Sequence, residues 1–203
     1  MKRSSRNAAR TKQEIIAKSA PVFNVHGYAG TKMQMLVDAT GFQMGGIYRH
    51  FETKMDLAKA VFQYTYEHQV MPNLQVEETL NPKEKILAIL ENYKQMIIKP
   101  KIAGGCPLLN SSTEVDDTDE AFRQLTQDSV DQVLGIMEGI LEEGKTSGHI
   151  LPGIDSQKEA EFIFATVEGT IMLRSLKRSR KPMFNIFDKI EEYFKEKVFV
   201  GEK

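Results

Sequence analysis

The chain has 203 residues, of which 41% are hydrophobic and 27% charged, a balance typical of a globular protein with one or two domains. A single cysteine excludes an internal disulfide framework, and no run approaches the roughly 18 apolar residues of a membrane span. Because the N-terminus also lacks the apolar core of a secretory signal, we expect a cytoplasmic protein without a membrane anchor.

The charge is distributed unevenly along the chain. Residues 1–54 contain nine Lys or Arg and three acidic residues, a balance of +6, so the net charge of −1 leaves −7 on the remainder. A basic N-terminal quarter indicates that this end meets a polyanion such as DNA. The alternative is a chance imbalance on a solvated surface.

The N-terminal residues predict an arm followed by a helix. Residues 1–10 are basic and lack apolar periodicity, so we expect a flexible arm that either contacts phosphates or is a solvated tail. A capping box at Thr11–Glu14 predicts the start of the first helix, which Pro21 should bend and Gly27 should end. The expected core of the N-terminal unit is Ile15, Ile16, Phe23, Leu36, Val37, Ile47, Tyr48 and Phe51.

Residues 31–54 predict two short helices joined by a tight turn, followed by the start of a third helix. Apolar residues recur at helical spacing after Thr31, which is the expected N-cap of the first of these helices. Gly41 should stop it, since glycine adopts the positive φ that a sharp turn between helices demands.

The next helix, expected over residues 43–51, is unusually weak. Gly45 and Gly46 each cost about 1 kcal/mol relative to Ala in a helix interior. A thin helix can approach base edges in a major groove about 12 Å wide; the alternative is a poorly formed helix packed on a core. Gln43 is the expected base reader. The expected DNA-binding residues are Thr31, Gln43, Met44, Gly45, Gly46, Tyr48, Arg49, His50 and Lys54.

This stretch resembles the N-terminal signature of the TetR family of one-component transcriptional regulators. The matching residues are Gly27-Tyr28, Thr31, Gly41-Phe42, Gly45, Ile47-Tyr48, His50-Phe51 and Lys54-Met55-Asp56-Leu57. Gly46 departs from the family, whose members commonly carry Ser, Thr or Ala there. The resemblance implies an all-α fold of about nine helices, with an N-terminal three-helix helix-turn-helix domain and a C-terminal helical bundle.

A capping pattern at Thr53–Asp56 predicts a fourth helix, which should run to about Val70 and stop at Met71–Pro72. This helix would be the lever between the two domains, and its N-terminus could bind a phosphate with Lys54 adding charge. The expected division is a flexible arm over 1–10, a DNA-binding domain over 11–52, and a ligand-binding and dimerisation domain over 53–203.

Five further helices are expected in the C-terminal domain. Asn81 and Asp155 are the expected caps of the first and fourth, and Gly144 should close the third. The fourth is apolar nearly all round, which implies burial against the domain core and a second subunit. The resemblance implies a homodimer formed through the last two helices. The five ranges are 82–100, 108–115, 120–144, 156–178 and 182–199.

A small-molecule inducer site is also implied in the bundle by the resemblance. Met and aromatic side chains make adaptable apolar walls, although core packing is the alternative for each residue alone. Cys106 stands in a Gly-Gly-Cys-Pro break and is either a sensor of oxidants or electrophiles or a small buried side chain. The expected ligand-binding residues are Tyr93, Met96, Cys106, Met137, Phe162, Phe164, Glu168 and Met172.

The sequence carries no catalytic or metal-binding signature, so we expect neither an enzyme nor a cofactor. Its four histidines are scattered, and it has no HExxH, paired cysteines, P-loop or GxSxG. We predict a ligand-responsive repressor that binds a palindromic double-stranded DNA operator as a homodimer and is released by a small molecule or electrophile. The alternative is an all-α small-molecule carrier or protein-interaction module without specific DNA binding.

Overall fold

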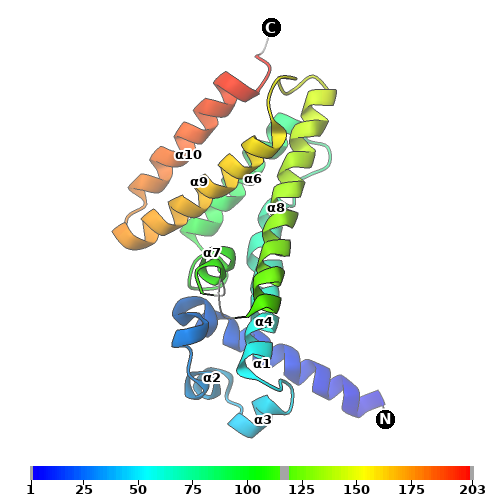
Figure 1. Cartoon of the computed structure of the whole chain (residues 1–203), viewed down its shortest axis with the longest axis vertical. Helices are drawn as coiled ribbons and strands as arrows, with labels where there is room; N and C mark the ends of the chain where they lie inside the picture. The colour runs from blue at the N-terminus through cyan, green and yellow to red at the C-terminus, as the bar shows by residue number, and fades with distance from the viewer. Residues whose placement is uncertain (1, 115–118, 202–203) are drawn as a thin grey trace. The chain divides into compact units, whose positions relative to one another are not determined.

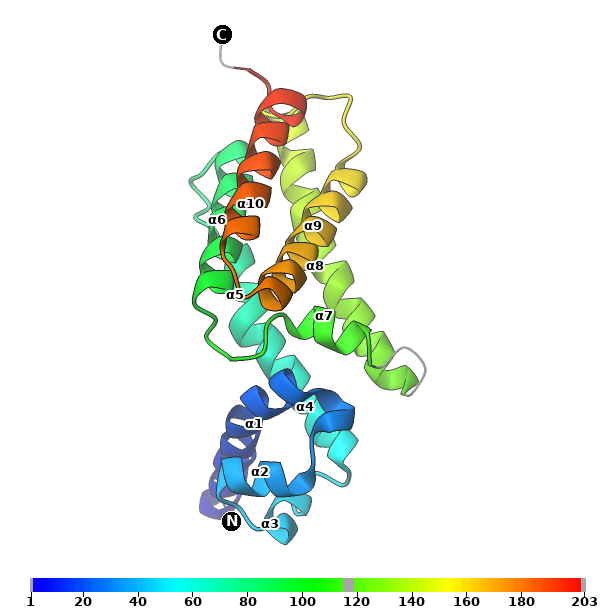
Figure 2. The same cartoon turned by 90° about the vertical axis from the view of Figure 1, so that its left-hand side faces the viewer.

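The computed structural model describes residues 2–114 and 119–201, with side chains from Asn7 onward, and its helices are shown in Figures 1 and 2. Across these residues the chain forms helices and no β-strand, apart from an isolated antiparallel bridge between Ile150 and Phe199. The expected all-α fold, with a helix-turn-helix at the N-terminus and a helical domain after it, is therefore confirmed.

The chain divides into two compact units. Unit 1 comprises Met1–Val70 with Lys101–Gln127, and unit 2 comprises Met71–Pro100 with Asp128–Lys203. The expected division had an arm over 1–10, a DNA-binding domain over 11–52 and a second domain over 53–203, whereas the compact unit 1 also includes residues 53–70 and 101–127. Lys101–Gln127 belongs to unit 1 because its helix α7 (Pro107–Ser112) packs against α1 and α4, which are distant in sequence.

Unit 1 holds the N-terminal helices, of which α1 packs against both α2 and α4. A π-helical turn, Tyr66–Val70, follows α4 directly. The start of α8 (Glu120–Thr146) also belongs to this unit, up to Gln127. The bounds of the first four helices are α1 Lys2–Gly30, α2 Met33–Thr40, α3 Met44–Tyr48 and α4 Lys54–Thr65.

Unit 2 contains the remainder of α8 and four other α-helices. α10 packs against both α6 and α9, and it continues into a π-helical turn, Phe194–Val198. Figures 1 and 2 both show α9 and α10 side by side. The bounds are α5 Met71–Leu74, α6 Pro82–Ile98, α9 Ser156–Lys177 and α10 Lys181–Tyr193.

The first helix begins earlier than expected. α1 starts at Lys2, so residues 2–10 are helical rather than a flexible arm, and the expected start at Thr11 is wrong. These residues include Arg and Ala, which favour helices, and no Gly or Pro interrupts them. Gly27 breaks the helix where expected, with φ 68° and ψ 176°, and one further turn reaches Gly30.

The core of unit 1 matches most of the prediction. Six of the eight expected side chains are buried, and Val37 is half-buried. Tyr48 is 42% exposed, so its expected burial is wrong. It follows Ile47, and adjacent residues of a helix point in different directions, so only one of them can face the core. The six buried side chains are Ile15, Ile16, Phe23, Leu36, Ile47 and Phe51.

The fourth helix was expected to stop at Met71–Pro72. The helical path instead continues after α4 through α5 to Leu74. A proline has no N–H and breaks an α-helical ladder. The π-helical turn Tyr66–Val70 lies directly before α5 and already interrupts the α-helical register. This interruption lets the chain accept Pro72.

The expected caps of unit 2 are confirmed. The Asn81 side chain accepts a hydrogen bond from the Glu84 N–H at 3.1 Å, and the Glu84 carboxylate accepts one from the Asn81 N–H at 2.8 Å. Asp155 accepts a hydrogen bond from the Lys158 N–H at 3.3 Å and caps α9. These short-range patterns therefore place the starts of α6 and α9 correctly.

Two other boundaries differ from the expectation. α8 passes through Gly144 to Thr146, and a methyl group at position 144 would lie 2.5 Å from Ile150 Cγ1. Gly144 therefore permits a close approach instead of ending the helix. α7 ends at Ser112; the expected end at Val115, and the cap positions 116–118 of the next helix, lie outside the described residues.

Candidate nucleic-acid interface and ligand site

The turn between α2 and α3 is built from a glycine and a buried threonine. Gly41 has φ 77° and ends α2, as expected. The Thr40 hydroxyl donates a hydrogen bond to the Leu36 carbonyl at 2.6 Å and accepts one from the Phe42 N–H at 3.2 Å. The Lys18 ammonium of α1 donates to the Thr40 carbonyl at 3.2 Å. These bonds hold α3 in a defined direction relative to α1 and α2.

α3 is anchored by one apolar side chain and leaves its remaining face exposed. Ile47 is buried in the core of unit 1. Gln43, at the N-cap position, is exposed and makes no capping hydrogen bond, and Met44 is also exposed. Tyr48 and Arg49 are exposed at the other end. Amide, hydroxyl and guanidinium groups of this kind can contact bases and phosphates.

The two glycines of α3 are not explained by packing or by backbone conformation. A methyl group at Gly45 would meet no atom within 4 Å, and one at Gly46 would lie 3.9 Å from Phe42 Cβ, an ordinary contact. Neither glycine has a positive φ. No contact or backbone angle within unit 1 therefore compensates for the loss of about 1 kcal/mol of helix stability that each glycine causes. Without side chains at these two positions, this part of α3 is open to close approach from outside.

Lys54 is the first residue of α4. Its ammonium lies over the Tyr28 ring, 4.3 Å from the ring centroid, and the side chain is half-buried. Desolvation by burial lowers the pKa of Lys54, against an opposing effect of the Glu114 carboxylate. Thr53 and Asp56 cap α4 reciprocally, so the position of Lys54 is well defined. Tyr28, which holds Lys54, was absent from the predicted site.

Thr31 was expected to be the N-cap of α2, and this expectation is wrong. Lys32 is the N-cap of α2, and the Thr31 side chain is 1% exposed. Its hydroxyl donates to the Gly27 carbonyl at 2.6 Å, and its N–H bonds to the same oxygen at 3.2 Å. Both donors are therefore engaged within the chain, because Thr31 closes the turn that follows the break at Gly27. The other eight predicted positions are exposed or half-exposed.

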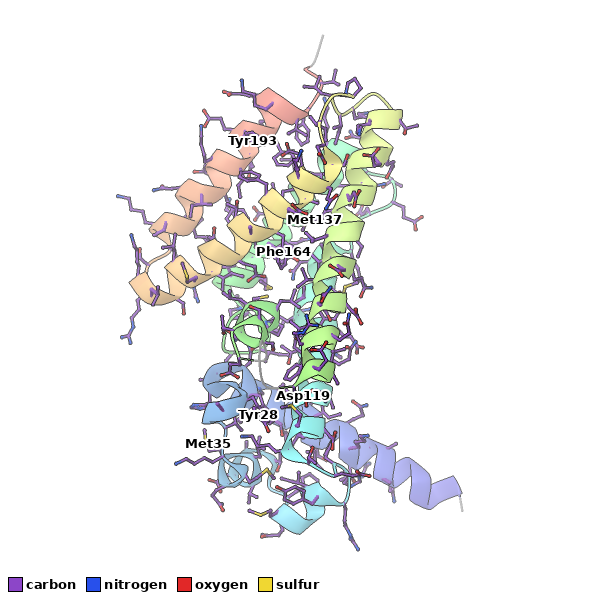
Figure 3. The ribbon with its side chains drawn as sticks, viewed as in Figure 1. Tyr28, Met35, Asp119, Met137, Phe164 and Tyr193 are labelled. Carbon is purple, nitrogen blue, oxygen red and sulfur yellow. The ribbon has the colours of Figure 1, made fainter. Side chains whose placement is uncertain are left out.

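The expected ligand residues of the bundle separate into an inner and an outer set. Tyr93, Met96, Met137 and Glu168 are buried and Phe164 is half-buried, on helices α6, α8 and α9. Figure 3 labels Met137 and Phe164. Their burial leaves core packing and ligand contact as the two interpretations.

The outer set consists of Phe162 and Met172, which are 42% and 47% exposed. The expectation that they line an internal pocket is wrong. The Phe162 ring instead contacts the Tyr193 ring of α10, with 5.2 Å between centroids. The apolar residues of α9 are not confined to one face, and the core of unit 2 covers only part of the helix. The opposite face carries these two side chains.

Cys106 belongs to unit 1, whereas the other seven expected ligand-binding residues belong to unit 2. It is the N-cap of α7, and its side chain is fully buried. Burial fits the alternative interpretation, a small side chain in the core; the sensor role stays a prediction. Among the described residues, no cluster of three or more His, Cys, Asp or Glu side chains could hold a metal ion. No helix of the described ranges is long and apolar enough to cross a membrane.

Two family models match the sequence. One is described as bacterial regulatory proteins, tetR family, and matches residues 15–61, which contain α2, α3 and the first part of α4. The other is described as tetracyclin repressor-like, C-terminal domain, and matches residues 82–190. The second match alone covers more than half of the chain.

Solved structures and curated sequences agree with these matches. A TetR transcriptional regulator from Chloroflexus aurantiacus J-10-FL is 32% identical, with a TM-score of 0.90 over 97% of this chain and 100% of its own. One from Cytophaga hutchinsonii is 32% identical, with a TM-score of 0.87 over 97% and 98%. The HTH-type transcriptional repressor DhaR of Mycobacterium sp. strain GP1 is 25% identical, over 85% of this chain and 86% of its own length.

Proposed function

Since this chain belongs to the TetR family of helix-turn-helix transcriptional regulators, we propose that it represses its target genes as a homodimer on a palindromic operator. The observation that carries the proposal is the exposed, glycine-containing face of α3. Its glycines are unexplained within unit 1, and its polar side chains suit base and phosphate contacts. A regulator of chromosomal DNA would work in the cytoplasm.

Gln43 is the proposed base reader. It lies at the N-terminus of α3, the end from which a recognition helix contacts base edges, and its amide can pair with adenine. Met44 and Arg49 are further candidates for base contacts. Tyr48, His50 and Lys54 are proposed to hold phosphates. In a dimer the two copies of α3 would enter successive major grooves about 34 Å apart.

The proposed dimer forms through the outer faces of α9 and α10. Phe162, Met172, Leu176 and Phe184 are large apolar side chains that remain exposed on these helices. Large apolar side chains exposed on two neighbouring helices suit a contact with another protein surface. A second copy of the same face would bury it, and the resulting twofold symmetry would match a palindromic operator.

The proposed response to a ligand uses the buried set Tyr93, Met96, Met137 and Glu168. A small molecule among these side chains would favour one arrangement of the lever helix α4 over another. A differential affinity of a few kcal/mol is enough to shift such an equilibrium, and the two reading helices would then no longer match the operator. DhaR, the similar protein from Mycobacterium, is a transcriptional repressor.

Fluorescence anisotropy with duplex DNA from the region upstream of the protein's own gene tests the proposal. We expect specific binding that weakens steeply with salt, because phosphate contacts release counterions. Tyr48→Ala should weaken binding at least tenfold and leave the oligomeric state unchanged. Gln75→Ala, a substitution at an exposed loop position between α5 and α6, is the matched control and should bind as the wild type does. Undiminished binding by Tyr48→Ala would refute the site assignment.

A further inference from the structure

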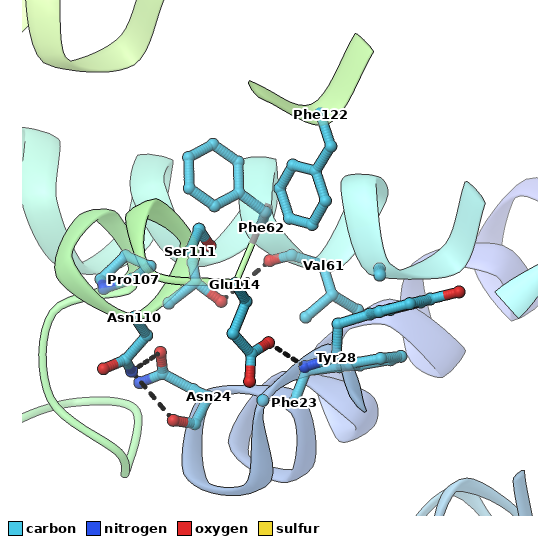
Figure 4. Close-up of a pocket in the computed structure, with 13 residues that line it drawn as sticks. Phe23, Asn24, Tyr28, Val61, Phe62, Pro107, Asn110, Ser111, Glu114 and Phe122 are labelled. Atoms are coloured by element: carbon cyan, nitrogen blue, oxygen red, sulfur yellow. Dashed lines mark hydrogen bonds between the residues drawn. The ribbon is translucent and has the colours of Figure 1, made fainter. Parts of the chain in front are cut away.

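A hollow in unit 1, shown in Figure 4, is largely filled by one of its own side chains. The Glu114 carboxylate accepts a hydrogen bond from the Tyr28 N–H, and a methyl group at Gly27 would collide with that carboxylate. The remaining cavity volume is about 40 Å³, close to the roughly 30 Å³ that one water molecule occupies in the liquid. This hollow therefore serves the packing of α1 against α7.

A larger hollow lies in unit 2, at the turn between α9 and α10 (Figure 1), and it is lined by positive charge. Its cavity volume is about 330 Å³, within the roughly 300–1,000 Å³ of small-molecule pockets. Residues 174–181 contain three Arg, two Lys and no acidic residue, and the nearest acidic residues along the chain are Glu168 and Asp188. The five lining residues are Arg174, Ser175, Arg178, Ser179 and Arg180.

Local helix structure accounts for only part of this basic cluster. Arg174 and Lys177 lie in the last turn of α9, where cations interact favourably with the helix dipole. Arg180 and Lys181 lie instead at the N-terminus of α10, where the dipole favours anions, and the first turn of α10 has no acidic residue. An anion bound here would reduce the repulsion among the cations and interact favourably with this end of α10.

The backbone of Arg178 has a conformation that glycine adopts more readily. Its φ of 47° and ψ of 34° are left-handed, and it is the only non-glycine residue with a positive φ in the part of the chain that the structure describes. Glycine or asparagine commonly occupies this position after a helix. Arginine brings a guanidinium group to the hollow here at a cost in backbone strain.

The guanidinium groups of the hollow have no counter-ion within the chain. Elsewhere in unit 2 lysines pair with acidic neighbours, for example Lys145 with Glu142 at 2.8 Å. In contrast, the side chains of Arg174, Arg178 and Arg180 form no ion pair and no hydrogen bond with any described residue. Three cationic forks therefore line one hollow and remain available to an anion.

We propose that this hollow binds a diphosphate group, either as free pyrophosphate or at the end of an organic molecule. A guanidinium group can bind two phosphate oxygens at once, and three of them together balance most of the charge of a diphosphate. The Ser179 hydroxyl accepts a hydrogen bond from the Lys181 N–H at 3.3 Å, so its own proton can be donated to a phosphate oxygen. All lining residues belong to unit 2 of one chain, so the proposal does not depend on operator binding.

Isothermal titration of the full chain with pyrophosphate and with sulfate, at pH 7.5 and constant ionic strength, tests this inference. We expect pyrophosphate to bind at least tenfold more tightly, because sulfate has one tetrahedral group and fewer charges. Changes in the amide chemical shifts of Ser175 and Ser179 should locate the bound pyrophosphate. Equal affinities, no binding of pyrophosphate at millimolar concentration, or shifts confined to other residues would overturn the proposal.

ADP distinguishes the two forms of the ligand. An affinity within tenfold of that of pyrophosphate, with the same amide shifts, would support a diphosphate carried by an organic molecule. Weaker binding of ADP, with pyrophosphate still bound at the hollow, would support free pyrophosphate.

Arg178→Gly separates anion binding from stability. Glycine adopts the left-handed conformation without strain, so the midpoint of urea unfolding should be unchanged or higher. The loss of one guanidinium group should nevertheless weaken pyrophosphate binding at least tenfold. Lys197→Gln makes the same change of net charge at an exposed position in the turn that follows α10, and it should bind as the wild type does. Unchanged affinity in Arg178→Gly, or an equal loss in both variants, would contradict the site.

Arg180→Lys distinguishes a specific site from diffuse attraction. Lysine keeps the charge but lacks the planar fork that binds two phosphate oxygens. Pyrophosphate affinity should therefore fall several-fold at constant ionic strength. Unchanged affinity would show that the cluster attracts anions through its net charge alone and would exclude a specific diphosphate site.

Discussion

The glycines of α3 and those of the tightly packed regions differ in what surrounds them. A methyl group would meet no atom within 4 Å at Gly45 and only an ordinary contact at Gly46, whereas at Gly104 and Gly144 it would collide with neighbouring atoms. The same residue type is thus demanded by the fold in one region and unexplained by it in the other. Packing therefore accounts for Gly104 and Gly144 but not for the glycines of α3.

Gly104→Ala should cause the largest loss of stability. Gly104 has φ 109°, and a methyl group there would collide with the backbone of Asn24 in α1. Backbone strain and overpacking each cost about 1–3 kcal/mol, so we expect a loss of about 3 kcal/mol or more. Urea unfolding followed by circular dichroism measures it. A loss below 1 kcal/mol would mean that this close approach does not persist in solution.

Gly144→Ala should have the next largest effect. The added methyl group would lie 2.5 Å from Ile150 Cγ1 and 3.0 Å from Pro82 Cβ. No positive φ is involved, so overpacking alone predicts a loss of about 1–3 kcal/mol. The same urea titration should also show partial recovery in the double variant Gly144→Ala with Ile150→Val, which removes Ile150 Cδ1, the atom 2.7 Å from the added methyl group. Without any recovery, the assignment to this contact would fail.

Gly45→Ala should change stability and DNA binding in opposite directions. Helix propensity predicts a gain of about 1 kcal/mol in the free energy of unfolding, because nothing obstructs the methyl group. If α3 approaches base edges closely, operator affinity should fall about tenfold in the anisotropy assay, which corresponds to about 1.4 kcal/mol. Higher stability with unchanged affinity would remove the case for close approach at this position.

Gly139→Ala is the matched control and should have the smallest effect on function. Gly139 is exposed on α8, and a methyl group there meets no atom within 4 Å. It should also gain about 1 kcal/mol of stability. Its operator affinity should equal that of the wild type. A loss like that of Gly45→Ala would attribute both effects to general stiffening of the chain.

Short-range patterns in the sequence predicted several parts of this protein correctly. Asn81 and Asp155 cap their helices, Gly41 ends α2, and Gly27 interrupts α1, each at the expected residue. These features depend on hydrogen bonds and backbone angles within about one helical turn, so neighbouring residues determine them. The TetR resemblance, carried by residues 11–61, was likewise visible in the sequence and is confirmed.

Other features were decided by contacts between distant segments. Thr31 is buried under the turn after Gly27, Gly144 accommodates Ile150, and Lys101–Gln127 packs with the N-terminal helices. Phe162 lies outside the core because the apolar residues of α9 are not confined to the face that packs in unit 2. Local periodicity identifies which residues are apolar, but the direction in which a helix buries them depends on which partners pack against it. The sequence by itself therefore determined the helices and the family, and the tertiary structure decided which side chains are available to a ligand.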